Sequence, residues 1–129
     1  MNLKRGIKLL TEHEGIGEPV KKGDRVVYNL KVFLNKGEEV PLNERQVEYL
    51  SEDRIRTADG TRFVDHCTQL GSREAIAGVE YSLFGMRKGG YRKVRVSPHL
   101  AFRREGLPEL VPADAVLVIE LWLREVLSE

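Results

Sequence analysis

The sequence predicts an α+β domain built from an antiparallel β-sheet and one main helix. Three observations support this fold class. Several short segments alternate apolar and polar residues, one central segment has helical spacing, and no period of about 20–50 residues repeats. A chain of 129 residues can bury one hydrophobic core but leaves little room for a second. We therefore expect one domain that extends over residues 1–129.

The first third of the chain has the pattern of strands joined by tight turns. Residues 7–12 are predicted to form a short strand, which a turn rich in Gly and Pro follows. Alternate positions of residues 26–34 are apolar, so one face of this longer strand should be buried. Residues 38–40 should complete a hairpin, and Pro41 limits them to an edge or an end of the sheet.

The most polar part of the chain is residues 42–62. Asn43 and Gln46 have the spacing of a capping box, which predicts a short helix in this segment. Asp59 and Gly60 form a turn signal, and the residues that follow, 62–66, have a strand pattern.

The second half contains the main helix and two further strands. Residues 72–84 are predicted to form the helix, with Ser72 as its N-cap. Residues 91–97 alternate as a strand with one solvated face. Residues 116–126 are almost entirely apolar at their start, as expected of a central strand. The apolar face of the predicted helix consists of Ile76, Val79 and Leu83.

The charge composition argues against nucleic acid as a partner. Lys and Arg total 21 against 20 Asp and Glu, and a formal net charge of +1 provides no overall field to attract a polyanion. A basic cluster in residues 87–95 is interpreted as the solvated face of a strand rather than as a nucleic-acid site.

Cysteine content and hydropathy exclude further classes. The single Cys67 cannot form an intrachain disulfide, and its neighbours Asp65 and His66 would alternate between the faces of a strand rather than surround an ion. We therefore expect no metal and no cofactor. The longest apolar stretch, 115–119, is too short to cross a bilayer, and the N-terminus lacks the apolar core of a signal peptide. A cytoplasmic protein that does not bind membranes is expected.

An ordered set of residues, most of them in the second half, has a distinctive order and spacing. Its members are Leu70, Gly71, Glu74, Ile76, Gly78, Met86, Gly89, Ser97, Pro98, Leu107, Pro108, Val111, Pro112 and Leu117, with Lys22, Gly23, Asp24 and Gly37 upstream. This set resembles that of the FKBP-type peptidyl-prolyl cis-trans isomerases, and no gap is needed from residue 70 to residue 126. The resemblance implies a bent antiparallel sheet wrapped around the main helix, an apolar pocket between them, and an insertion at residues 42–62.

The resemblance also implies an activity, which is rotation of Xaa-Pro bonds in proline-containing peptide or protein segments without a cofactor. Rotation requires loss of amide resonance, a barrier of about 18–20 kcal/mol, and removing the bond from water disfavours its polar planar state. By position, the catalytic residues would be Ile76, through its main-chain N–H, Phe102 and Asp65. The substrate-binding residues would be Leu30, Phe63, Val79, Leu110, Val111 and Ile119.

Several of these positions depart from the family pattern. Val79 stands where the family has a tryptophan, Leu30 where it has a tyrosine and Ile119 where it has a phenylalanine. Phe102 keeps the ring of a family tyrosine but lacks its hydroxyl group, and one hydrogen bond is worth about 0.5–1.5 kcal/mol. Loss of the flat aromatic walls weakens the contact with a proline ring further. We therefore expect an isomerase of reduced activity.

Two alternatives follow from the same comparison. The Phe-Asp pair of the family corresponds to Val40 and Pro41 without a gap, or to Phe63 and Asp65 after the insertion, and the second placement is preferred for its side chains. An alternative function is an FKBP-like interaction module without catalysis. In that case the insertion at 42–62, or the exposed arginines, would bind a partner protein.

Overall fold

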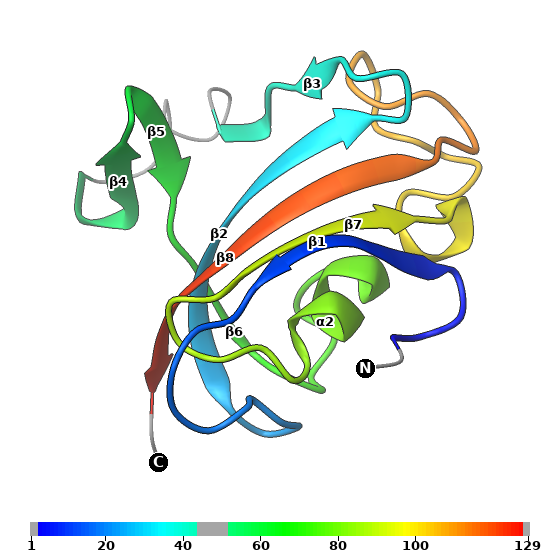
Figure 1. Cartoon of the computed structure of the whole chain (residues 1–129). Helices are drawn as coiled ribbons and strands as arrows, with labels where there is room; N and C mark the ends of the chain where they lie inside the picture. Colours follow the sequence, from blue (N-terminus) through cyan, green and yellow to red (C-terminus); the bar gives the residue numbers. More distant parts are fainter. Residues whose placement is uncertain (1–2, 44–51, 128–129) are drawn as a thin grey trace.

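The computed structural model describes residues 3–43 and 52–127 and shows a bent antiparallel sheet that wraps around a short helix (Figure 1). The strands follow the order β1-β7-β8-β2-β3, and β6 pairs with the first half of β2. The predicted α+β class is confirmed. The strands of this sheet are β1 (Ile7–His13), β2 (Arg25–Leu34), β3 (Glu39–Val40), β6 (His66–Gln69), β7 (Tyr91–Val96) and β8 (Leu117–Leu127).

The last strand is the centre of the sheet, as its apolar composition predicts. β8 pairs with β7 on one side and with β2 on the other, so Ile119 lies opposite Val94 and Val32 at once. Leu121 lies opposite Leu30 in the same way. Because side chains alternate along a strand, this register directs one apolar row of β8 towards the helix and a second row to the opposite face.

The main helix, α2 (Ala77–Leu83), begins five residues later than the predicted Ser72 cap. The hydroxyl group of Ser72 donates instead to the carbonyl oxygen of Gln69 at 2.6 Å, which closes a turn ahead of the helix. Arg73 then has a positive φ of 63°, a conformation that a helix cannot include. The prediction of helix over residues 72–76 is therefore wrong, because local turn bonds compete successfully with helical ones.

A second, two-stranded sheet occupies part of the predicted insertion. After a 3₁₀ turn at Glu52–Arg54, β4 (Ile55–Ala58) pairs with β5 (Thr61–Val64). Asp59 and Gly60 have positive φ values of 49° and 77° and form the tight turn between them. Residues 55–64 are therefore a hairpin, as the turn signal at Asp59 and Gly60 indicates, and the short helix predicted from Asn43 falls mostly on residues 44–51, which lie outside the described residues.

Asn43 holds this hairpin onto the main sheet. Its side-chain amide donates to the carbonyl oxygen of Leu30 at 2.9 Å, and its Oδ1 accepts from the N–H of Val64 at 3.0 Å. One buried side chain therefore links β2 to β5. The capping-box prediction placed Asn43 at the start of a helix. Its side chain bonds instead to Leu30 and Val64, which are distant in sequence, so local spacing does not reveal this role.

The core lies between α2 and the concave face of the main sheet. It consists of aliphatic residues of β2, β7 and β8 that pack against Val79 and Leu83 of the helix. Arg92 is an exception, since its side chain is 1% exposed and its guanidinium group pairs with Glu12 at 2.7 Å. Within the described residues, no helix is long and apolar enough to span a lipid bilayer.

Candidate functional site

Seven of the nine predicted site residues belong to the hydrophobic core between α2 and the sheet or pack against it. Leu30, Val79 and Ile119 are 8%, 3% and 0% exposed, and we call them the base. Ile76, Phe102 and Leu110 are half-buried at the edge of the core, and we call them the rim. We call all seven the apolar cluster; its members are Leu30, Ile76, Val79, Phe102, Leu110, Val111 and Ile119.

The loop after β7 positions two members of the cluster by its own backbone bonds. The short helix η2 (Pro98–Leu100) begins this loop. The N–H of Leu107 donates to the carbonyl oxygen of Val111 at 2.9 Å, and the N–H of Val111 donates back to Leu107 at 2.8 Å. Gly106 permits the close approach, because a Cβ atom there would lie 2.3 Å from the carbonyl oxygen of Val111. Leu110 and Val111 are therefore held by a closed turn.

Ile76 places a main-chain donor at the rim of the cluster. It occupies the N-cap position of α2, and its carbonyl oxygen accepts from the N–H groups of Val79 and Glu80 at 3.0 and 3.1 Å. Its own N–H donates to no backbone acceptor within residues 3–43 and 52–127. A donor of this kind is independent of the side chain, and it is available to a ligand carbonyl group.

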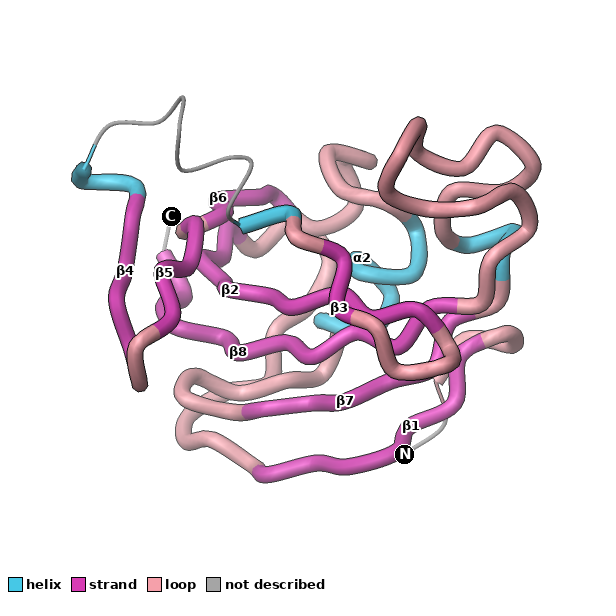
Figure 2. The backbone as a smooth tube through the Cα atoms, turned by 90° about the horizontal axis from the view of Figure 1, so that it is seen from above, coloured by secondary structure: helices cyan, strands magenta, loops and turns pink. Residues whose placement is uncertain are grey.

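Phe63 and Asp65, the other two predicted site residues, lie on the opposite face of the sheet. The Phe63 ring packs edge-on against Trp122 with 5.2 Å between centroids. Trp122 alternates along β8 with Leu121 and Leu123, which face the core. In Figures 1 and 2 the β4–β5 hairpin and the loop at residues 105–116 lie on opposite sides of the molecule.

Asp65 belongs to a polar network on that face. The Asn29 amide nitrogen donates to its carboxylate at 2.5 Å, and the Arg56 guanidinium lies 3.3 Å away. The Arg124 guanidinium donates to Oδ1 of Asn29 at 2.6 Å, and burial together with the nearby Arg56 lowers the pKa of Arg124. These contacts tie the hairpin to β2 and β8 and place Asp65 apart from the apolar cluster, and its assignment to catalysis stays a prediction.

Val40 and Pro41, the other placement of the family's Phe-Asp pair, lie beside the cluster. Val40 is buried in the core, and both residues line a groove of about 550 Å³ that Leu110 and Val111 share. This is the placement that the alignment without a gap gives. The acidic side chains that line the groove were not predicted, since they combine residues at β3 with a residue of the loop after β7, namely Glu38, Glu39 and Glu109.

The described residues offer no metal centre, because residues 3–43 and 52–127 contain no suitable group of three or more His, Cys, Asp or Glu side chains. His66 stacks on Tyr28 with 5.3 Å between ring centroids, and burial lowers the pKa of His66. Cys67 is exposed and bears no disulfide. The apolar cluster itself offers an apolar surface and a main-chain donor.

Replacing Asp65 with alanine separates its two possible roles. We expect a loss of about 1–2 kcal/mol in the free energy of unfolding, since Asn29 loses one acceptor but keeps the carbonyl oxygen of Val64. The rate of Xaa-Pro isomerisation, compared by exchange NMR at equal folded concentration, should stay within a factor of about two. A tenfold fall in rate at unchanged stability would support the assignment of Asp65 to catalysis.

Comparison with known proteins matches the chain to one family and to FK506-binding proteins. The family described as FKBP-type peptidyl-prolyl cis-trans isomerase matches residues 17–124. The chain is 30% identical over 122 residues to FK506-binding protein 4 of Chaetomium thermophilum, which covers 95% of this chain and 22% of that protein. It is 27% identical over 116 residues to FK506-binding protein 1A of Neurospora crassa, covering 89% of this chain and 83% of that protein. The chain thus spans about a fifth of the first relative and most of the second.

Proposed function

Because the chain belongs to the FKBP-type peptidyl-prolyl cis-trans isomerase family, we propose that it catalyses rotation about Xaa-Pro bonds of protein substrates at the apolar cluster, at a reduced rate. The observation that carries this proposal is that a main-chain donor, a half-buried aromatic ring and an aliphatic loop all border the same hydrophobic core. Their residues are Ile76, Phe102 and Leu110.

The proposed mechanism needs only binding interactions. The proline ring would rest on the apolar cluster, which excludes water from the amide that twists. The N–H of Ile76 would donate to a substrate carbonyl group and fix the chain on one side of the bond. Rotation to the twisted state then loses less solvation than it does in water, and each 1.4 kcal/mol gained in this way gives about a tenfold higher rate.

Two features support a reduced rate. The positions at the base of the cluster carry aliphatic side chains that are almost fully covered, so they offer a proline ring little surface. Phe102 brings a ring to the rim but no hydroxyl group. Binding of a proline ring therefore depends mainly on the half-buried rim residues, Ile76, Phe102 and Leu110.

The test is exchange NMR of cis/trans interconversion in a short Xaa-Pro peptide, whose uncatalysed rate is slow enough to reveal weak catalysis. The decisive pair of variants is Ile76→Pro and Ile76→Ala. Both remove the side chain, but only proline removes the N–H, and the φ of −60° at this position suits proline. We expect the proline variant to be about three- to tenfold slower than the alanine variant, as expected for one lost hydrogen bond. Equal rates, or no catalysis by the unaltered protein, would contradict the proposal.

Phe102→Tyr restores the hydroxyl group at the rim. We expect kcat/KM for the peptide to rise about three- to tenfold, provided that the hydroxyl can bond to bound substrate. Phe102→Leu is the matched control, because it keeps an apolar side chain but loses the flat ring, and it should lower the rate. If both variants have the rate of the unaltered protein, Phe102 does not contact the substrate.

A second candidate function is binding without catalysis. The burial of Leu30, Val79 and Ile119 favours this second function, because these side chains leave little accessible surface at the base of the cluster. A proline segment could then bind at the rim while the bond that twists stays in water. Chemical-shift changes at Ile76 and Leu110 on addition of peptide, with no acceleration of exchange, would favour this function over the first.

A further inference from the structure

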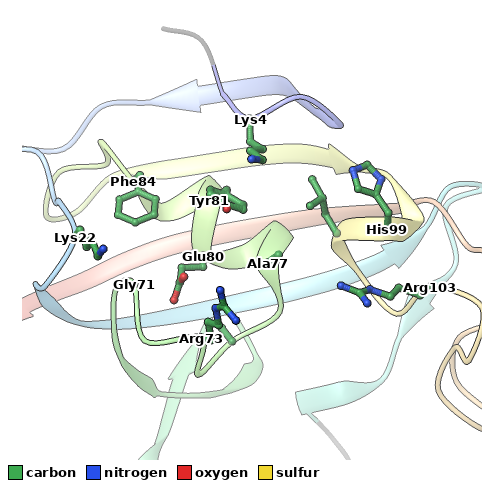
Figure 3. A pocket seen from close by; sticks show the side chains of 12 residues that line it. Lys4, Lys22, Gly71, Arg73, Ala77, Glu80, Tyr81, Phe84, His99 and Arg103 are labelled. Carbon is green, nitrogen blue, oxygen red and sulfur yellow. The ribbon is translucent and has the colours of Figure 1, made fainter.

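A hollow on the solvent side of α2 is surrounded by basic side chains (Figure 3). Its volume is about 740 Å³, and it shares no residue with the apolar cluster. Lys4, Lys22, Arg73 and Arg103 line it from four separate segments of the chain. Among the described residues that line it, Glu80 is the only acidic one. Folding therefore concentrates positive charge here in a protein whose formal net charge is only +1. We call this feature the basic hollow.

Two of its arginines have an unusual backbone conformation. Arg73 and Arg103 have φ values of 63° and 55°, in the left-handed region that residues other than glycine rarely adopt. Both are held by neighbouring bonds: the hydroxyl of Ser72 donates to Gln69, and the carbonyl oxygen of Arg103 accepts from Asp114 at 2.8 Å. Strained backbone that the surroundings maintain is concentrated at binding sites. The two charges are thus carried by fixed positions of the loops that border the basic hollow.

The floor of the basic hollow is partly aromatic. Tyr81 is 36% exposed, although it is a large hydrophobic residue, and the Lys4 ammonium group lies 4.8 Å from its ring centre. A ligand that combines negative charge with an apolar stem would contact both the cations and this ring.

We propose that the basic hollow binds an acidic, Asp/Glu-rich segment of a partner protein. Arginine guanidinium groups bind carboxylates through paired hydrogen bonds, and the exposed ring offers an apolar surface for the stem of a side chain. A nucleic acid would need an extended basic stripe, whereas the positive charge here surrounds a single concave site.

The proposal is tested with a fluorescein-labelled, proline-free peptide of alternating Asp and Glu residues. Its binding is followed by fluorescence anisotropy at low salt and at about 0.15 M salt. The variant Arg73→Glu/Arg103→Glu is compared with Lys36→Glu/Arg62→Glu, which has the same net charge. Lys36 and Arg62 are exposed in the β2–β3 turn and in the β4–β5 hairpin, outside the basic hollow.

We expect the first double variant to bind the peptide at least about tenfold more weakly, while the control stays within about twofold of the unaltered protein. Amide resonances of Ala77, Glu80 and Tyr81 should shift on titration. Equal losses in both double variants would overturn the proposal, because general electrostatics would then explain binding. Tighter binding of a labelled oligothymidylate than of the peptide would also overturn it. Because the peptide contains no proline, these outcomes are independent of isomerase activity.

Discussion

Replacing Arg92 with methionine is expected to lower the free energy of unfolding by about 3–5 kcal/mol, the largest effect on stability that we predict. The guanidinium group of Arg92 donates to the Glu12 carboxylate at 2.7 Å and to the carbonyl oxygens of Ser82 and Phe84 at 2.9 and 2.7 Å. Methionine fills a similar volume but cannot donate to any of the three. Two carbonyl groups at the end of α2 would then remain unpaired, at a cost of about 1–3 kcal/mol each.

Chemical denaturation measures this effect, and Arg95→Met is the matched control. Arg95 lies on the same strand but is exposed, and its guanidinium contacts Asn35 at 3.2 Å, so its replacement should change stability by less than about 0.5 kcal/mol. The melting temperature of the Arg92 variant should fall by roughly 10–20 °C. Equal stability of the two variants would show that the buried arginine contributes no more than a surface residue.

Replacing Gly78 with alanine is expected to have the largest effect on activity. A Cβ atom at this position would lie 2.5 Å from Cγ1 of Val96 and 2.8 Å from the carbonyl oxygen of Leu100, so α2 must move away from β7 and η2. Ile76 lies two residues before Gly78 and Val79 directly after it. Their displacement would disturb the rim and the base of the apolar cluster together. A shift of about 1 Å at a reacting centre can reduce a rate about 100-fold.

The stability of this variant balances two opposing effects. Alanine is favoured over glycine in a helix by about 0.8–1.0 kcal/mol, whereas overpacking costs about 1–3 kcal/mol. Because one of the two clashes is with a backbone atom, the steric cost should be the larger, and we expect a net loss of about 1–2 kcal/mol. Exchange NMR and denaturation measure the two consequences separately.

Ala77→Gly is the control for helix propensity, since it makes the opposite change one residue earlier. It should cost about 1 kcal/mol but leave the isomerisation rate within about twofold. Unchanged activity of Gly78→Ala would mean that the helix can move without altering the site. That result would argue against the assignment of Ile76 and Val79 to the substrate-binding surface.

The rim and the base of the apolar cluster differ in how they could contribute to function. Leu30, Val79 and Ile119 are almost fully covered, so their main contribution is to the core and to the position of α2. Ile76, Phe102 and Leu110 are half-buried and accessible to a ligand. The proposed isomerase thus depends on the rim, and the variants at Ile76 and Phe102 examine it directly.

Local apolar patterns are sufficient to predict four strands of the main sheet from the sequence. Alternation predicted β1, β2, β7 and β8, the apolar start of β8 predicted its central place, and an ordered motif set predicted the family. These inferences succeed because a strand with one buried face must alternate, and a strand buried on both faces must be apolar along its length.

Three other features depend on contacts that no local pattern records. Whether Phe63 and Asp65 or Val40 and Pro41 adjoin the cluster depends on where the hairpin docks, which the bonds of Asn43 and Asn29 fix across distant segments. The start of α2 depended on a competing turn at Ser72. The basic hollow collects charges from four loops, so no local pattern predicts it. In each case the deciding contacts join residues far apart in the chain, or form in competition with a regular helix, and neither is recorded in sequence periodicity.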